Sequence, residues 1–214
     1  PCCRGSKGLA AMGRSAPRKQ FSPKRITLAG IVLRKWCAHM KSTGKVRVAL
    51  IGFGQQKTIS ENQIIRALGL LPDDHLTDLL CIKYDPNRDI RCSGWYDPNQ
   101  KGIIIFRFKD ELDFYKLLYH EIAHHVFDNV LSIDERYIWV NEISRSEGCV
   151  SSYALKNTQE DFAESYSLYV FGPALLLDFR EKFRFMKQVV FSEYIPNSFI
   201  LSLPFANPKA HWHV

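Results

Sequence analysis

The feature that most limits the possible folds of this chain is the segment His120–His124, with the sequence HEIAH. It lies inside a predicted helix, Glu111–Leu131, for which Asp110 is the expected N-cap. Residues four apart share one face of a helix, so the two imidazoles can bind one metal ion, with the carboxylate of Glu121 beside them. The sequence therefore predicts a helix that packs around a metal site. The alternative is a chance pair of surface histidines.

A hydrolytic zinc site usually has three protein ligands and a water, so HEIAH leaves one ligand to be found. The pattern HExxHxxGxxH is absent, because the region that ends at Val130 and Leu131 supplies neither its glycine nor its third histidine. A second predicted helix, Thr158–Phe171, places Glu160 and Glu164 four residues apart on one face. Either carboxylate could bind the metal while the other accepts a hydrogen bond from a ligand histidine. The alternative is a solvated acidic face.

The rest of the chain alternates short apolar strands with amphipathic helices. Strands are predicted at Val46–Phe53 and Leu79–Tyr84 and in a hairpin of Gly94–Tyr96 with Gly102–Phe108, and further helices at Ser60–Leu71, Asp134–Asn141 and Ala174–Tyr194. This order favours an α/β (α+β) fold in which a small twisted mixed sheet packs on the HEIAH helix and a second helix carries the glutamates.

Charge divides the chain into two parts. Its 214 residues include 29 Lys and Arg and 22 Asp and Glu, a net charge of +7. The first 60 residues hold 13 of the basic residues and no acidic one, which leaves 16 basic against 22 acidic residues, a net charge of −6, in the remainder. We expect residues 1–45 to be a basic, disordered tail or a remnant and residues 46–214 to form the folded domain. Nucleic acid is an expected partner of the tail alone.

Several classes of protein are not indicated. No apolar run reaches the roughly 18–20 residues of a membrane-spanning helix, and no secretory signal is evident, so we expect a soluble protein without assigning its compartment. The six cysteines are too few and too scattered for a disulfide-rich miniprotein, and the absence of a CxxC pair argues against a thiolate zinc site. The oligomeric state is not predicted.

The segment Tyr153–Glu164, YALKNTQEDFAE, resembles the second motif of the anthrax lethal factor-like zinc metallopeptidases, a group of gluzincins that includes the Pro-Pro endopeptidases. That motif is a tyrosine, six residues, a glutamate and then Phe-Ala-Glu within the next turn, downstream of HExxH. The resemblance covers residues 95–172. It implies a zincin-like domain in which His120, His124 and Glu160 bind one zinc ion.

The resemblance also implies roles for three neighbouring residues. Glu121 would act as the general base that removes a proton from the zinc-activated water and returns it to the leaving amine. Tyr153 would donate a hydrogen bond to the developing oxyanion; the alternative is a loop aromatic that packs under the helix. Glu164 would accept a hydrogen bond from a ligand histidine.

A strand that precedes the metal helix is implied to bind the substrate as an added, extended strand. Gly102–Phe108 is our candidate, with Ile103, Ile104 and Ile105 as the residues in contact with a peptide or protein substrate. The alternative is a fully buried central strand.

These observations predict a zinc-dependent endopeptidase with one Zn²⁺ per chain. Two other hypotheses stay open: a catalytically inactive zinc-binding domain with a structural or interaction role, and a nucleic-acid-associated protein that uses the basic tail. The presence of Glu121 and Tyr153 favours the endopeptidase over the inactive zinc-binding domain, because a structural zinc site needs neither residue. The sequence does not indicate the cleavage-site preference, including whether it is directed by proline.

Overall fold

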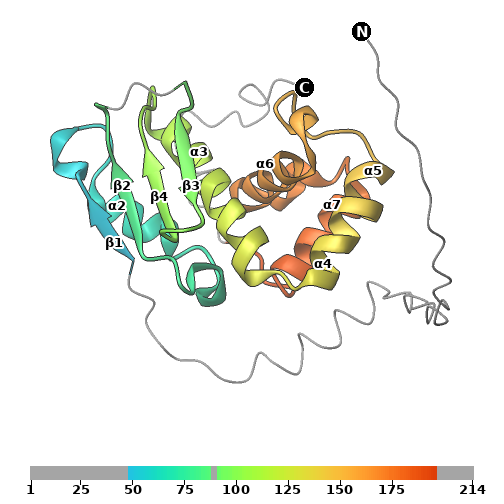
Figure 1. Ribbon diagram of the computed structural model, residues 1–214. Helices are drawn as coiled ribbons and strands as arrows, with labels where there is room; N and C mark the ends of the chain where they lie inside the picture. Colours follow the sequence, from blue (N-terminus) through green and yellow to red (C-terminus); the bar gives the residue numbers. More distant parts are fainter. Residues whose placement is uncertain (1–47, 88–90, 197–214) are drawn as a thin grey trace, which may run out of the picture.

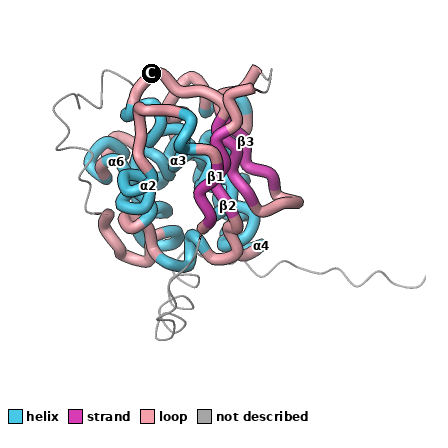
Figure 2. Tube along the Cα trace, turned by 90° about the vertical axis from the view of Figure 1, so that its left-hand side faces the viewer, coloured by secondary structure: helices cyan, strands magenta, loops and turns pink. Residues whose placement is uncertain are grey.

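The computed structural model describes residues 48–87 and 91–196 (Figure 1). The predicted tail, residues 1–45, lies outside these ranges. A small sheet forms one side of the molecule and a group of helices the other, with α3 between them (Figure 1). Seen from the side, the strands lie together, and α2 and α3 cover the same face of the sheet (Figure 2).

The sheet is mixed, as predicted. Its strand order is β1-β2-β4-β3. Its members are β1 (Ala49–Ile51), β2 (Cys81–Tyr84), β3 (Gly94–Asp97) and β4 (Gly102–Ile105). The first three strands in that order are parallel, whereas β3 pairs antiparallel with β4 through the predicted hairpin and forms an edge of the sheet. Together with the helices, this arrangement confirms the α+β class.

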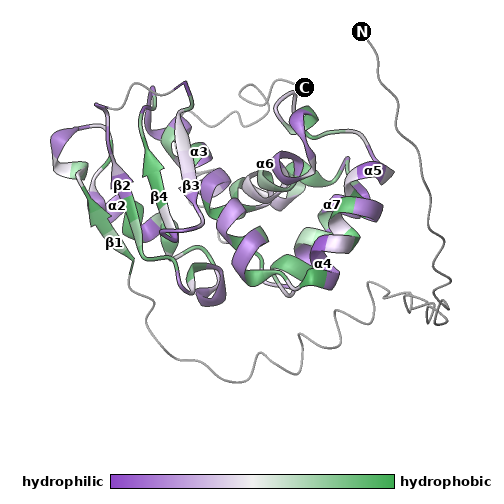
Figure 3. Cartoon of the chain, in the orientation of Figure 1, coloured by the Kyte–Doolittle hydropathy of each residue, from purple (hydrophilic) through white to green (hydrophobic). Residues whose placement is uncertain are grey.

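The position of β4 corrects one expectation. Ile104 pairs with Lys83 of β2 on one side and with Trp95 of β3 on the other, so both edges of β4 are used within the sheet. The side chains of Ile103 and Ile105 are fully buried, and β4 is hydrophobic along its length (Figure 3). Strand addition at Ile103, Ile104 and Ile105 is therefore ruled out, and the alternative of a buried central strand is correct. The outer edge of β3 is not paired with any strand of the described residues.

Helix α3 (Glu111–His125) packs against one face of the sheet and contains the HEIAH segment. Asp110 caps it as predicted, since its carboxylate accepts a hydrogen bond from the main-chain N–H of Asp113. A π-helical turn, Val126–Val130, extends it close to the predicted end. Helix α2 (Glu61–Leu68) has the expected cap at Ser60 and ends three residues before the predicted position.

The second half of the chain is helical. Helix α4 (Ile133–Ile138) continues through a π-helical turn into α5 (Ser144–Ser146). Helix α6 (Thr158–Phe171) has the predicted bounds, and Asn157 caps it by accepting hydrogen bonds from two main-chain N–H groups. It packs along α3 in the most extensive contact between two of the described elements. None of the helices in residues 48–87 and 91–196 is long and apolar enough to cross a membrane.

The predicted single helix Ala174–Tyr194 is wrong. The chain forms a short 3-10 turn, Pro173–Leu176, leaves helical geometry at Phe179, and begins again as α7 (Arg180–Phe185) with a π-helical extension. The new helix start depends on a residue far away in the sequence. The carboxylate of Glu147 accepts hydrogen bonds from the main-chain N–H groups of Glu181 and Lys182, in the first turn of α7, at 3.1 and 3.3 Å. A distant side chain thus stabilises a helix start that local periodicity does not show.

A buried ion pair joins α7 to the rest of the helical half. Lys182 is fully buried, and its Nζ donates to both carboxylate oxygens of Asp161 on α6, at 2.6 and 2.8 Å. It also donates to the carbonyl oxygen of Gly148 at 2.8 Å. A charge away from water is tolerated when it is paired and fully hydrogen-bonded. Lys182 therefore fixes the first turn of α6 and the loop before it.

Replacing Lys182→Met should lower the free energy of unfolding by about 3–5 kcal/mol, because Asp161 keeps a buried charge without its partner. Urea unfolding followed by circular dichroism measures the effect. Lys187→Met is the matched control: Lys187 forms an exposed pair with Glu193, and its loss should cost at most about 1 kcal/mol. Equal effects of the two substitutions would show that the buried pair does not stabilise the fold.

Candidate metal centre

The two histidines of HEIAH meet Glu160 between α3 and α6. Nε2 of His120 lies 3.2 Å from Nε2 of His124 and 3.0 Å from Oε2 of Glu160. The third side of this triangle, from Nε2 of His124 to Oε2 of Glu160, is 3.4 Å. Ligand atoms about 2.0–2.1 Å from a tetrahedral zinc ion lie about 3.3 Å from one another. The structure thus brings the predicted ligand set together as a group that could hold a metal ion, with the spacing that zinc requires.

The chemistry of these three atoms also fits a cation. Oε2 of Glu160 is buried, and the atoms that face it are Nε2 of His120 and Nε2 of His124, which can donate to it only while they carry a proton. Once these nitrogens are deprotonated, the buried carboxylate oxygen needs another positive charge to compensate it. Two imidazoles and one carboxylate are a donor set found in catalytic zinc sites. The residues present therefore fit a zinc ion.

Glu164 orients His120, the first of the candidate ligands. Nδ1 of His120 donates to Oε1 of Glu164 at 2.8 Å, and Oε2 of Glu164 accepts from Oγ of Ser151 at 2.7 Å. Oγ of Ser151 accepts in turn from the main-chain N–H of Ala154 at 3.1 Å. A proton on Nδ1 leaves the lone pair of Nε2 free for a metal. Glu164 makes the predicted contact, whereas Ser151 was missed because no motif marks a serine that acts through a folded loop.

The same contacts set the protonation of the cluster. Burial alone would lower the pKa of His120, but Glu160 and Glu164 raise it to about 9. Burial alone would raise the pKa values of both glutamates, but His120 lowers each of them below its ordinary range. The site therefore favours ionised carboxylates around a histidine that holds its proton tightly until a stronger cation takes that place.

Glu121 lies next to the ligands and faces the sheet edge. It is 5% exposed, and its carboxylate accepts a hydrogen bond from the main-chain N–H of Tyr96 on β3. The approach is close: a Cβ atom on Gly94 would lie 2.9 Å from Oε1 of Glu121 and 2.9 Å from a methyl group of Leu117, so a larger residue there would displace both side chains. Burial raises the pKa of Glu121, against the influence of the nearby histidines. A carboxyl with a raised pKa is suited to accept and return a proton.

His125 follows the candidate ligand His124 in the sequence, but its side chain contacts other residues. Its Nε2 lies 2.9 Å from the carbonyl oxygen of Thr77, and its Nδ1 lies 3.2 Å from the hydroxyl of Tyr96. Nδ2 of Asn129 donates to the same hydroxyl at 2.7 Å. These residues fasten β3 to the end of α3. Sequence reasoning missed Tyr96 and Gly94 as supports of Glu121, because their role depends on which strand lies beside the helix.

Tyr153 lies on the open side of the cluster. Its ring packs edge-on against the ring of His120, with 5.5 Å between the centroids, and the side chain is 42% exposed. Nζ of Lys156 lies 3.4 Å from the centre of the Tyr153 ring. Tyr153 is therefore not a residue packed under the helix, and it lines the same pocket as His120 and Glu121.

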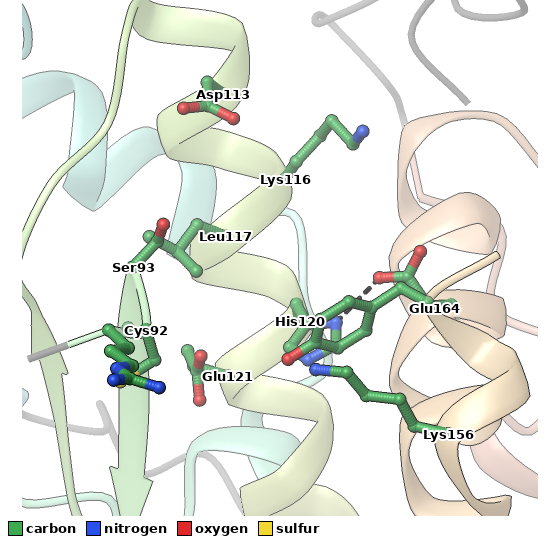
Figure 4. Close-up of a pocket in the computed structure, with 12 residues that line it drawn as sticks. Cys92, Ser93, Asp113, Lys116, Leu117, His120, Glu121, Lys156 and Glu164 are labelled. Atoms are coloured by element: carbon green, nitrogen blue, oxygen red, sulfur yellow. Dashed lines mark hydrogen bonds and ion pairs between the residues drawn. The ribbon is translucent and has the colours of Figure 1, made fainter. Parts of the chain in front are cut away.

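The pocket has a volume of about 470 Å³ and opens between the edge of the sheet and the helical half. One wall is the segment from Arg91 to Gly94, another is α3, and the third is formed by the Tyr153 loop and α6. Figure 4 shows Glu121 on the side of β3, with His120 and Glu164 joined across the gap between α3 and α6. The pocket thus gives a ligand access to His120, Glu121 and Tyr153 together.

No protein-family model matches the chain, and no curated protein or solved structure matches it. The function is therefore inferred from the motifs and from the geometry of the site.

Ser151→Ala should weaken zinc binding about tenfold, because Glu164 loses a donor and no longer holds His120 in one orientation. Competition with a chromophoric chelator measures the affinity. Ser152→Ala is the matched control, since Ser152 is exposed and the hydrogen bond to Glu164 comes from its neighbour Ser151. An unchanged affinity in Ser151→Ala would contradict the proposed support.

Zinc binding should depend on pH in a defined direction. At pH 7, below the pKa of about 9 of His120, the ring carries a proton on each nitrogen, and zinc must displace the one on Nε2. Each zinc ion should therefore release about one proton from His120, and the apparent affinity should rise about tenfold per pH unit between about pH 7 and 8. Calorimetry in buffers of different ionisation enthalpy counts the protons. Binding at pH 7 without proton release would show that His120 is already neutral.

Proposed function

We propose that this protein is a zinc-dependent endopeptidase with a zincin-like domain, similar to the lethal factor-like metallopeptidases. The observation that carries the proposal is the triangle of His120, His124 and Glu160 with Glu121 beside it at the wall of an open pocket. A purely structural zinc site has no need of an adjacent buried carboxylate or of an opening to solvent.

The chain's own residues divide the chemistry between them. His120, His124 and Glu160 would hold the zinc ion, and Glu164 keeps the ring of His120 in place. When bound, zinc supplies a Lewis acid that polarises a carbonyl and lowers the pKa of water. Glu121 takes a proton from the attacking water and passes it to the departing amine, a role to which its raised pKa is suited.

The hydroxyl of Tyr153 is the candidate donor to the reacting carbonyl oxygen. As negative charge develops on that oxygen, a hydrogen bond to it becomes stronger than in the ground state, which lowers the barrier. Its partial exposure and its contact with His120 support this role, because the side chain reaches the pocket without being locked into the core.

The outer edge of β3 is suited to bind a substrate in extended conformation. The N–H of Tyr96 points away from β4, toward Glu121, and hydrogen-bonding directions alternate along a strand. The main-chain groups of Gly94 therefore also face the pocket. An extended peptide can pair with this edge by β-augmentation, the recognition mode first expected for β4. Because the pocket is open between the two halves of the molecule, a peptide can extend on both sides of the cleaved bond, as an endopeptidase requires.

The decisive experiment compares three forms of the protein. Wild type should contain about one zinc ion per chain and cleave members of a peptide library. Glu121→Gln should keep the zinc and lose at least about a thousandfold in kcat/KM, because the base is removed with little change of shape. His120→Ala should lose the zinc. Metal analysis and mass spectrometry of the peptides provide the two readouts.

The outcomes separate the hypotheses. A wild type that binds zinc and cleaves no peptide would favour the inactive zinc-binding domain. A wild type without affinity for zinc would contradict both the endopeptidase and the inactive zinc-binding domain. The nucleic-acid hypothesis concerns residues 1–45, which lie outside the described residues, and it stays a prediction.

A further inference from the structure

The acidic side chains that line the pocket are each held by the protein. Asp113 accepts a hydrogen bond from a main-chain N–H at the start of α3, at 2.9 Å. Glu121 accepts one from the main chain of β3. Glu164 accepts from a ligand histidine and from Ser151. These carboxylates serve the fold and the metal centre.

The basic side chains of the pocket are placed differently. Arg91, Lys116 and Lys156 line it from its three walls. Burial lowers the pKa of Lys116, and Glu164 and Asp113 act against that shift. Lys156 is exposed, and no carboxylate among the described residues forms an ion pair with it. The charge of Lys156 is therefore not neutralised by an ion pair with a carboxylate of the described residues.

Lys156 is nevertheless held in a defined place. Its Nζ lies 3.4 Å from the centre of the Tyr153 ring, and that ring packs against His120. Figure 4 shows the side chain extending from the side of α6 toward His120. A hydrogen bond with Tyr153 raises the pKa of Lys156, so the ammonium is fully charged at neutral pH. The ring of Tyr153, the proposed oxyanion donor, thus lies between the positive charge of Lys156 and the candidate ligand His120.

A lysine ammonium has three donors, and the contact with the ring of Tyr153 does not use all of them. A substrate carboxylate in the pocket would receive a charge-assisted hydrogen bond, which is stronger than a bond between neutral groups. Because Lys156 is so near the ligands, the groups within its reach are those next to the reacting carbonyl.

We propose that Lys156 makes the pocket select substrates that carry a carboxylate on a residue flanking the scissile bond. This inference rests on the proposed peptidase function. The carboxylate belongs either to an Asp or Glu side chain or to the free C-terminus of a short peptide, and Lys156 recognises the same chemistry in both. Arg91 and Lys116 add to the positive potential of the pocket.

The experiment uses pairs of peptides that differ only by Glu or Gln at each position flanking the cleavage site, so that shape is kept and charge is changed. Each pair is made with a free and with an amidated C-terminus. The kcat/KM ratio of Glu to Gln peptide is measured for the full-length wild type, Lys156→Met and Lys156→Glu. Lys57→Met is the control, because Lys57 is exposed and does not line the pocket. A ratio cancels any general loss of catalysis caused by the contact of Lys156 with Tyr153.

Wild type and Lys57→Met should prefer the Glu peptide about tenfold at low salt. Lys156→Met should reduce the ratio to about one, and Lys156→Glu should invert it. A preference for Glu over Gln assigns the carboxylate to a side chain, whereas a preference for the free over the amidated form of the same peptide, lost in Lys156→Met, assigns it to the C-terminus. If wild type shows neither preference, or if Lys156→Met retains the one that wild type shows, the inference is overturned and the peptidase function stays intact.

A binding measurement separates the two proposals. Fluorescence anisotropy of labelled peptides with Glu121→Gln reports affinity without cleavage. The Glu peptide should bind about tenfold more tightly than the Gln peptide, and Lys156→Met in the same background should remove the difference. Failure of wild type to cleave any peptide would contradict the proposed function even if this binding preference is found.

Discussion

The contact on which the rest of the site depends is that of His120 with two glutamates of α6. One nitrogen of the ring meets Glu160 at 3.0 Å and the other meets Glu164 at 2.8 Å. A single imidazole thus fixes the rotation and the height of α6 against α3, because a helix turn in either direction would separate both pairs. Packing of the apolar faces brings the two helices together, and this polar contact selects one arrangement among those that the packing allows.

Supports for this arrangement come from both halves of the protein. On the sheet side, the hydroxyl of Tyr96 is held by His125 and Asn129, and its main chain holds Glu121. On the helical side, Lys182 pairs with Asp161, the residue next to Glu160. The buried groups among these are paired with polar partners, which gives specificity of position at an interface that apolar contacts alone would leave less defined.

The sequence predicts those parts of the molecule that depend on local pattern. The helices α3 and α6, the hairpin and the pair His120 and His124 follow from periodicity, caps and motif spacing, whereas the choice of Glu160 over Glu164 depends on the resemblance. The order of strands does not, because the apolar run of β4 is compatible with a central or an edge position until its neighbours are known. The break at Phe179 and the role of Ser151 depend on partners more than ten residues away, Glu147 and Glu164, and no local signal reveals them.

The hydrogen bond between Glu121 and the N–H of Tyr96 has a consequence for any strand that joins the sheet at β3. Gly94 can offer its main chain to such a strand, but the next outward-facing donor is already occupied. The pairing ladder is interrupted at that point, and the added chain must leave the sheet edge there. Since the interruption is the proposed base itself, a peptide that paired with this edge would be released from regular pairing beside the proposed catalytic groups. Termination of the ladder would then choose the peptide bond that is presented for hydrolysis.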